Sequence, residues 1–205
     1  MGQSGTASTV YVSGDPTLVS QAIGGWDSAC WGPLVLDLED DGLKTTSVFD
    51  PVIFDLDGDG LSDVTAWLAP EADDAFLALD LNENSMIDDG TELLGDASGG
   101  SAFGSRNGFE ALASYDSDLD GRITPQDPVW TELLVWQDSN YNGTSEESEL
   151  RPLTSLGIVF IQLEINESDE IDGHGNRYRY RSWFVRKGKG RSSIIDVYFD
   201  YDPGR

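Results

Sequence analysis

Five short acidic segments in this sequence carry oxygen-bearing side chains at a spacing that suits a metal ion. Each has aspartate at position 1, an acid or asparagine at position 3, and aspartate or asparagine at position 5, and four have glycine at position 6. When such a loop curls, these side chains point inward and the glycine permits a sharp turn. The position 7 carbonyl adds an oxygen, and a carboxylate at position 12 closes the site. The segments, named first to fifth loop in chain order, begin at Asp37, Asp55, Asp80, Asp116 and Asp138.

The fourth and fifth loops match the whole twelve-residue pattern of a calcium-binding EF-hand loop. Two full matches 22 residues apart predict calcium binding strongly, whereas solvated acidic loops would explain the clustering but not the spacing. The fifth loop offers Asp138, Asn140, Asn142, the Thr144 carbonyl, Glu146 and Glu149. The fourth offers Asp116, Asp118, Asp120, the Arg122 carbonyl, Thr124 and Asp127.

The other three loops lack an acid at position 12. The third loop has Glu92 at position 13, which can close the site if a short helix begins one residue late. A site without a closing carboxylate should bind more weakly unless a distant residue completes it, and magnesium is the rival ion throughout. The candidate ligands are Asp80, Asn82, Asn84, Met86 (carbonyl), Asp88 and Glu92 in the third loop, Asp55, Asp57, Asp59, Leu61 (carbonyl) and Asp63 in the second, and Asp37, Glu39 and Asp41 in the first.

The overall charge agrees with a cation-binding protein. Among 205 residues, 38 are acidic and 12 basic, a formal net charge of −26. A surface this negative argues against binding nucleic acid or an anionic membrane. No run of 18 apolar residues predicts a membrane span, and the opening residues lack the features of a secretory signal peptide. Cys30 and His174 are single residues of their kinds, which excludes an intramolecular disulfide and a Cys/His zinc site. We expect Cys30 to pack and His174 to lie on the surface.

The elements around the loops predict an α+β fold. Short apolar runs at 34–37, 52–55, 64–68 and 75–79 indicate strands that lead into or out of the first three loops. Helical patterns at 107–115, 125–136 and 147–156 flank the fourth and fifth loops, so we expect a central paired EF-hand at about 107–156. Strands at 157–165, 177–184 and 194–199, with a turn at 173–176, predict a C-terminal antiparallel β region. Residues 1–25 indicate a flexible tail or linker, and residues 26–205 a single calcium-binding domain.

Seven of the 12 basic residues fall within 177–191, which we name the basic hairpin. One interpretation is a site for an acidic partner, such as another protein or a cell-surface component. The other, favoured in so acidic a chain, is that these side chains neutralise acidic loops of their own domain. They are Arg177, Arg179, Arg181, Arg186, Lys187, Lys189 and Arg191.

The order of the motifs resembles a bacterial family. The run from Pro33 to Gly42, PLVLDLEDDG, is similar to the opening of the calcium-dependent self-processing module of RTX-type iron-regulated proteins. The resemblance continues through 54–60, 79–84, 88–96 and 108–113 to about residue 165, and the tail resembles bacterial EF-hand-containing relatives. It implies a secreted protein whose module folds on binding several Ca²⁺ ions.

The resemblance also implies an activity. In that family the Asp-Pro bond just before the module is cleaved, and the aspartyl carbonyl is linked to a lysine amine. The chemistry needs the carboxylate of that aspartate, and the matching bond here is Gly32–Pro33. We therefore expect a non-enzymatic, extracellular structural or interaction module. Self-cleavage at an Asp-Pro bond and adhesion through the basic hairpin are the alternatives.

Overall fold

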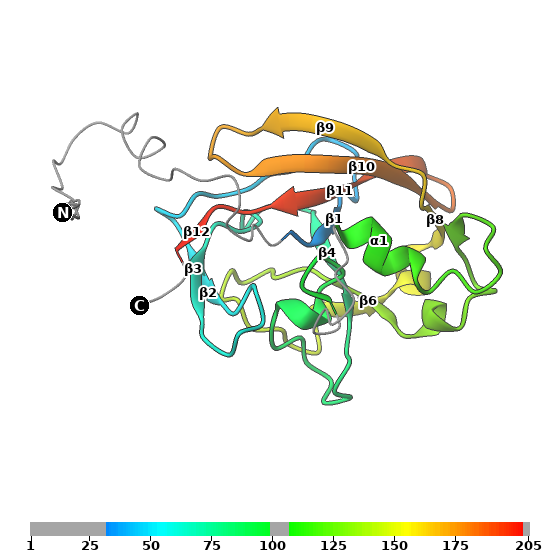
Figure 1. The fold of residues 1–205 in the computed structure, drawn as a ribbon, viewed down its shortest axis with the longest axis horizontal. Helices are drawn as coiled ribbons and strands as arrows, with labels where there is room; N and C mark the ends of the chain where they lie inside the picture. Colours follow the sequence, from blue (N-terminus) through cyan, green and yellow to red (C-terminus); the bar gives the residue numbers. More distant parts are fainter. Residues whose placement is uncertain (1–31, 99–106, 203–205) are drawn as a thin grey trace, which may run out of the picture.

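The computed structural model describes residues 32–98 and 107–202, which form two antiparallel sheets (Figure 1). The predicted tail and Cys30 lie outside the described residues. The larger sheet contains nine strands in the order β5-β8-β10-β11-β1-β4-β6-β7, with β9 paired to β10. Its strands are β1 Leu34–Leu36, β4 Ala75–Leu79, β5 Arg122–Ile123, β6 Leu133–Trp136, β7 Leu150–Pro152, β8 Ile158–Gln162, β9 Asn166–Ile171, β10 Arg177–Arg186 and β11 Gly190–Tyr198.

The smaller sheet has the order β12-β3-β2. It joins β2 (Val52–Phe54) and β3 (Asp63–Thr65), which flank the second loop, to the chain-terminal β12 (Tyr201–Asp202). Isolated bridges, such as Thr45 with Leu68, connect segments outside the named strands. The first and last parts of the described chain therefore lie side by side.

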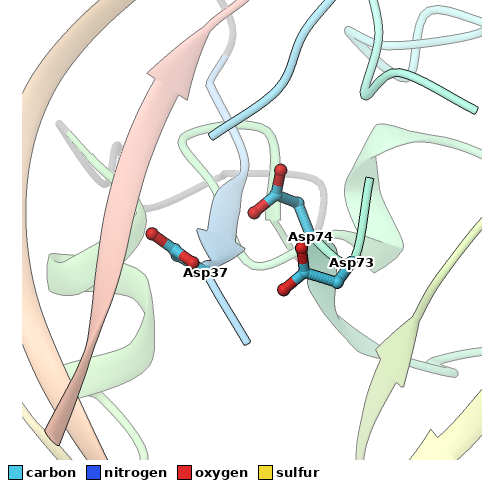
Figure 2. A group of neighbouring side chains, drawn as sticks. All are labelled: Asp37, Asp73 and Asp74. Carbon is cyan, nitrogen blue, oxygen red and sulfur yellow. The ribbon is translucent and has the colours of Figure 1, made fainter. Parts of the chain in front are cut away.

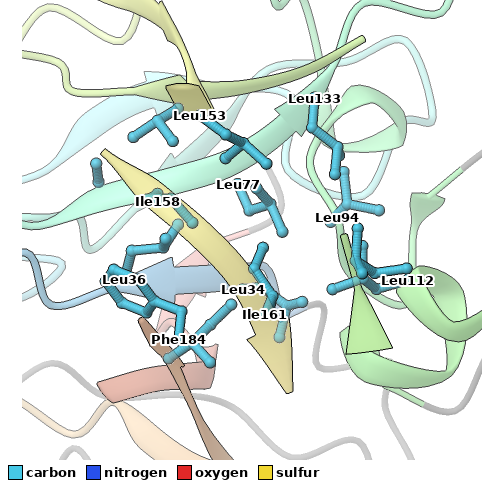
Figure 3. Close-up of a cluster of buried hydrophobic side chains, with 14 of the residues drawn as sticks. Leu34, Leu36, Leu77, Leu94, Leu112, Leu133, Leu153, Ile158, Ile161 and Phe184 are labelled. Carbon is cyan, nitrogen blue, oxygen red and sulfur yellow. The ribbon is translucent and has the colours of Figure 1, made fainter. Parts of the chain in front are cut away.

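Both faces of the large sheet are buried at β1 and β4, and these two strands are apolar without interruption. Successive side chains of a strand point to opposite faces. Leu77 of β4 thus joins a cluster with Leu34 and Phe184 (Figure 3), whereas Phe76 packs on the other face. The second face holds an aromatic cluster in which the rings of Trp67 and Trp136 lie 5.6 Å apart.

The predicted central EF-hand pair is wrong, and with it the α+β class. Among the described residues the single α-helix is α1 (Gly108–Ala113), which Asn107 caps by accepting the Glu110 amide proton over 2.8 Å. The segment predicted as helix at 125–136 is a 3₁₀ turn, η4 (Pro128–Thr131), followed by β6. The segment at 147–156 is β7 followed by η5 (Leu153–Leu156).

The cause lies in the pattern of residues 133–136. Leu133, Val135 and Trp136 are fully buried in the sheet, where β6 pairs with both β4 and β7. A short, continuous apolar run of this kind fits a buried strand as well as a helix face. The strands predicted elsewhere overlap β1, β2, β3, β4, β8, β10 and β11, whereas the polar β9 was not predicted. No helix of the described residues is long and apolar enough to cross a membrane.

Candidate metal centres

All five acidic loops share one backbone turn, although only the fourth loop follows a helix. In each loop the leading aspartate accepts the amide protons of positions 5 and 6 on its two carboxylate oxygens, over 2.8 to 3.3 Å. Positions 4 and 6 have positive φ in every loop, at residues that include Leu119, Tyr141 and Ser85. Left-handed backbone is uncommon outside glycine. The repeated conformation therefore belongs to the loop pattern and not to glycine alone.

Glu149, the predicted closing residue of the fifth loop, accepts hydrogen bonds from the loop backbone. Glu149 Oε1 accepts the Ser139 amide proton over 2.8 Å, and its Oε2 accepts the longer hydrogen bond from the Glu146 amide. Asp138 and Glu149 are both more than nine-tenths buried. The side-chain amides of Asn140 and Asn142 donate to the Glu146 carboxylate, and the backbone amide of Thr144 donates to Asn142 Oδ1.

The fourth loop is closed in the same way by Asp127. Its Oδ1 accepts the Ser117 amide proton and its Oδ2 accepts that of Thr124, both over 2.8 Å. Oxygens of Asp116, Asp118 and Asp127 lie within 4.8 Å of one another. The Asp120 amide donates to Asp118 Oδ1. The Arg122 guanidinium instead stacks on Phe160 at 4.9 Å, so this residue offers the loop only its backbone carbonyl.

The third loop is closed by Glu92, one position later than the pattern requires. Glu92 lies at the end of the short 3₁₀ turn η2 (Gly90–Glu92). Its Oε1 accepts the Leu81 amide proton over 3.0 Å and its Oε2 accepts that of Asp88 over 2.9 Å. These are the loop positions 2 and 9 that Glu149 contacts in the fifth loop. The side-chain amides of Asn82 and Asn84 donate to Asp88, and the exposed Met86 offers a carbonyl.

The second loop is closed by Asp63 at position 9. Asp63 Oδ2 accepts the Leu56 amide proton over 2.9 Å, which is again the amide of position 2. Oxygens of Asp55, Asp57 and Asp63 lie within 4.8 Å of one another. The two remaining predicted residues are exposed: Asp59 accepts the amide proton of Leu61, whose side chain is 62% exposed.

The first loop is assembled differently from its prediction. Asp37 is 2% exposed and lies within 4.8 Å of oxygens of Asp73 and Asp74, which sequence reasoning missed (Figure 2). Glu39 instead contacts Lys189 of the basic hairpin, and Asp41 forms an ion pair with Lys44 over 2.8 Å. The structure thus separates the three predicted residues of this loop.

The loops are paired, but not in the predicted order. Ser145, at position 8 of the fifth loop, accepts the Ile87 amide proton on its hydroxyl over 2.7 Å and donates to the Ile87 carbonyl over 3.3 Å. Ile87 occupies position 8 of the third loop. The third and fifth loops therefore lie side by side, whereas Ile123, at position 8 of the fourth loop, pairs with Ile161 of β8.

Burial disfavours the charged form of several loop carboxyls. It raises the pKa of Asp37, Asp55, Asp63 and Glu92, and it raises the pKa of Asp74 to about 7. Burial also opposes ionisation of Asp127 and Glu149. Hydrogen bonds outweigh it there, from Thr124 and Ser117 to Asp127 and chiefly from Glu146 and Ser139 to Glu149, so both pKa values are lowered. A bound cation would favour ionisation of the first group, because an opposite charge nearby lowers a carboxyl pKa.

Comparison with known proteins identifies a family for this chain. A family model described as the SPM domain matches residues 34–200. The chain is 40% identical over 173 residues to the iron-regulated protein FrpA of Neisseria meningitidis serogroup C. That alignment covers 82% of this chain and 15% of FrpA, so the chain spans a small part of this relative's length. The matched range takes in all five acidic loops, and we conclude that the chain belongs to the SPM domain family.

Proposed function

We propose that this chain is a non-enzymatic calcium-binding domain of an extracellular protein, and that calcium holds it in its folded form. The observation that carries the proposal is the repeated pair of carboxylates. In four loops, the leading aspartate accepts the amide protons of positions 5 and 6, and a second carboxylate accepts the amide proton of position 2. Two acids are thereby fixed around one space in each loop.

The donor set favours calcium over other metals. The side chains offer carboxylate and amide oxygens and no sulfur, and the described residues contain one histidine, the exposed His174. Hard cations prefer such ligands, and softer transition metals prefer imidazole and thiolate. Calcium accepts six to eight oxygens in adaptable geometry, whereas magnesium needs a tight octahedron and keeps several waters. Loops with four or more candidate oxygens fit calcium better.

Charge couples binding to folding. The formal charge is −26, and five ions of charge +2 would reduce it to about −16 at one ion per loop. The second loop joins β2 to β3, and the fifth joins β6 to β7, so repulsion within a loop acts directly on the sheets. Metal binding that occurs only in the folded state stabilises that state. Extracellular modules bind calcium at roughly 10⁻⁴–10⁻³ M, so export would trigger folding.

The environment of Gly32 supports a non-enzymatic role. Residue 32 precedes the proline that matches the family's cleaved bond, and it has no carboxylate. A Cβ atom at this position would lie 2.9 Å from Asp196 Oδ1 and 2.9 Å from the Tyr198 ring, so a side chain here requires a shift. This chain therefore lacks the reacting carboxylate at that bond. The side chains of Asp196 and Tyr198 occupy the space that a side chain at position 32 would need.

The basic hairpin supports an internal role over adhesion. Arg186 lies 3.5 Å from Glu39 of the first loop, and Lys189 contacts the same carboxylate. Arg181 pairs with Glu170 of β9 over 2.6 Å, and Arg191 stacks on Trp183. Several cations of the hairpin thus already have partners in the chain.

A calcium titration of chelated protein tests the proposal. Calorimetry measures the number of ions, far-UV circular dichroism measures the gain of structure, and a denaturing gel of the same samples detects cleavage. We expect several ions to bind, β-structure to increase and the chain to stay intact. A chain that is fully folded without metal and binds calcium negligibly would contradict the proposal, and a new calcium-dependent fragment would contradict its non-enzymatic part.

A further inference from the structure

The antiparallel pairing of β1 and β4 places two acids opposite each other. Its register sets Leu36 against Ala75, so the next pair along the ladder is Asp37, which leaves β1, and Asp74, which precedes β4. Asp73 directly precedes Asp74 in the chain. Carboxylate oxygens of all three lie within 4.8 Å of one another, and Figure 2 shows the three groups turned toward a common space. Like charges that face each other across two strands destabilise a sheet unless something lies between them.

Two oxygens of this group lack a partner. Asp74 is 2% exposed; its Oδ2 accepts the Lys44 amide proton over 2.8 Å, but nothing among the described residues donates to its Oδ1. The buried Oδ2 of Asp73 likewise has no donor in the described ranges. A buried acceptor without a partner costs about 1–3 kcal/mol, and more when it is charged. A cation bound beside Asp37 would satisfy both of these oxygens.

The first loop also lacks a component that the other four have. Its leading Asp37 accepts the amide protons of Asp41 and Gly42 as in every loop. Position 12 is Val48, and the loop segment itself supplies no closing carboxylate. We propose that Asp73 and Asp74, about 35 residues downstream, close the first loop and form with Asp37 a divalent cation site that bridges the ends of β1 and β4.

The chemistry of the site points to a hard cation of calcium type. Three carboxylates converge without nitrogen or sulfur, which suits calcium. Lys44 supplies the nearest positive charge: its Nζ lies 2.8 Å from Asp41 and 3.6 Å from Asp73 Oδ1. One ammonium at this distance offsets one of the charges and leaves the two orphan oxygens unpaired. The ion would join two neighbouring central strands of the large sheet, so its binding would stabilise the pairing of β1 with β4.

The test compares calcium binding by the full chain and by the double variant D73N/D74N. Asparagine keeps the size and an acceptor oxygen for the Lys44 amide but removes both charges. Calorimetry should show one ion fewer per chain, and the NMR amide signals of Gly42, Lys44 and Ala75 should stop responding to calcium. The matched control, E71Q/D169N, removes two charges from exposed positions outside the loops and should bind as many ions as the unmodified chain.

The outcomes separate this inference from the proposed function on which it rests. If the unmodified chain binds no calcium, the proposed function fails. If it binds calcium but D73N/D74N binds the same number of ions with the same amide shifts, the bridging site alone is wrong. Should the double variant not fold in calcium, the single variant D73N decides, because its side chain is 27% exposed. That variant should weaken the same site by about tenfold or more, and an unchanged affinity would overturn the assignment.

Discussion

Trp67 donates its indole N–H to Asp138 Oδ2 over 2.9 Å, which ties the centre of the aromatic cluster to the leading aspartate of the fifth loop. The two residues are 71 positions apart, and both are more than nine-tenths buried. The same oxygen accepts the Gly143 amide proton that shapes the loop. The core therefore orients this carboxylate directly, and loop geometry and core packing should respond to each other.

The first prediction is that Trp67→Phe weakens both the fold and the fifth site. The substitution removes the indole donor, so Asp138 keeps only the loop amides of Asn142 and Gly143. A hydrogen bond to a charged group contributes about 1.5–3 kcal/mol. Urea unfolding in saturating calcium should show a loss of this size in unfolding free energy, and calorimetry a weaker calcium affinity.

Trp130→Phe is the matched control for this experiment. Trp130 is 3% exposed, but among the described residues its Nε1 has no acceptor. Its replacement removes ring volume without removing a hydrogen bond, so it should destabilise less and leave calcium affinity unchanged. Equal effects of the two substitutions would show that the bond to Asp138 is unimportant.

The second prediction concerns closure of the fifth loop. Glu149→Gln keeps an oxygen for the Ser139 amide but removes the charge and the bidentate carboxylate that completes a calcium shell. Calorimetry should show affinity for one ion reduced by about tenfold or more, with the remaining ions unaffected. The exposed neighbour Glu147 provides the control, since Glu147→Gln should change nothing. A Glu149→Gln protein with unchanged binding would remove the fifth loop from the set of calcium sites.

The five loop turns could be predicted from the sequence because their geometry is local. The turn around Asp138 is set by residues within five positions of it, and the closing Glu149 follows at a fixed spacing. Even the displaced Glu92 could be anticipated, because a short turn, η2, moves it by one residue. Turns of this kind are determined by neighbours along the chain, which the sequence displays directly.

The flanking elements could not be predicted in the same way. Whether residues 133–136 form a helix or a strand depends on β4, more than 50 residues earlier, which offers an edge for pairing. The bond between Ser145 and Ile87 and the approach of Asp74 to Asp37 likewise arise from strand register. The sequence offered one signal for the role of Asp74. Asp73 and Asp74 are adjacent acids that directly precede the strand predicted at 75–79.

The third prediction tests whether the third and fifth loops are coupled. Ser145→Ala removes the hydroxyl that contacts the amide and the carbonyl of buried Ile87. An unsatisfied buried amide costs about 1–3 kcal/mol, so the unfolding free energy should fall by this amount. Calcium should also bind to the two loops with less cooperativity. Ser148→Ala, at an exposed position, is the control, and equal cooperativity in the two variants would mean that the loops bind independently.

The fourth prediction follows from Asp96, which accepts the Gly32 amide proton over 2.7 Å. Burial raises the pKa of Asp96 to about 6 from its ordinary 3.8, so between these values the folded chain binds more protons than the unfolded chain. Stability should therefore fall as pH rises from about 4 to 6. The neighbouring Asp196 contributes in the same direction, because burial raises its pKa above the ordinary value and the folded chain then holds a proton that the unfolded chain has lost.

Asp96→Asn should remove this part of the pH dependence. Unfolding free energies measured in saturating calcium should agree for the two proteins near pH 4, and at pH 7 the variant should be more stable by about 2 kcal/mol. Loop carboxylates titrate in both proteins, so the difference between the two curves isolates Asp96. Asp169→Asn, an exposed control outside the loops, should run parallel to the unmodified chain. A difference between Asp96→Asn and the unmodified protein that stays constant from pH 4 to 7 would show that Asp96 ionises normally in the folded chain.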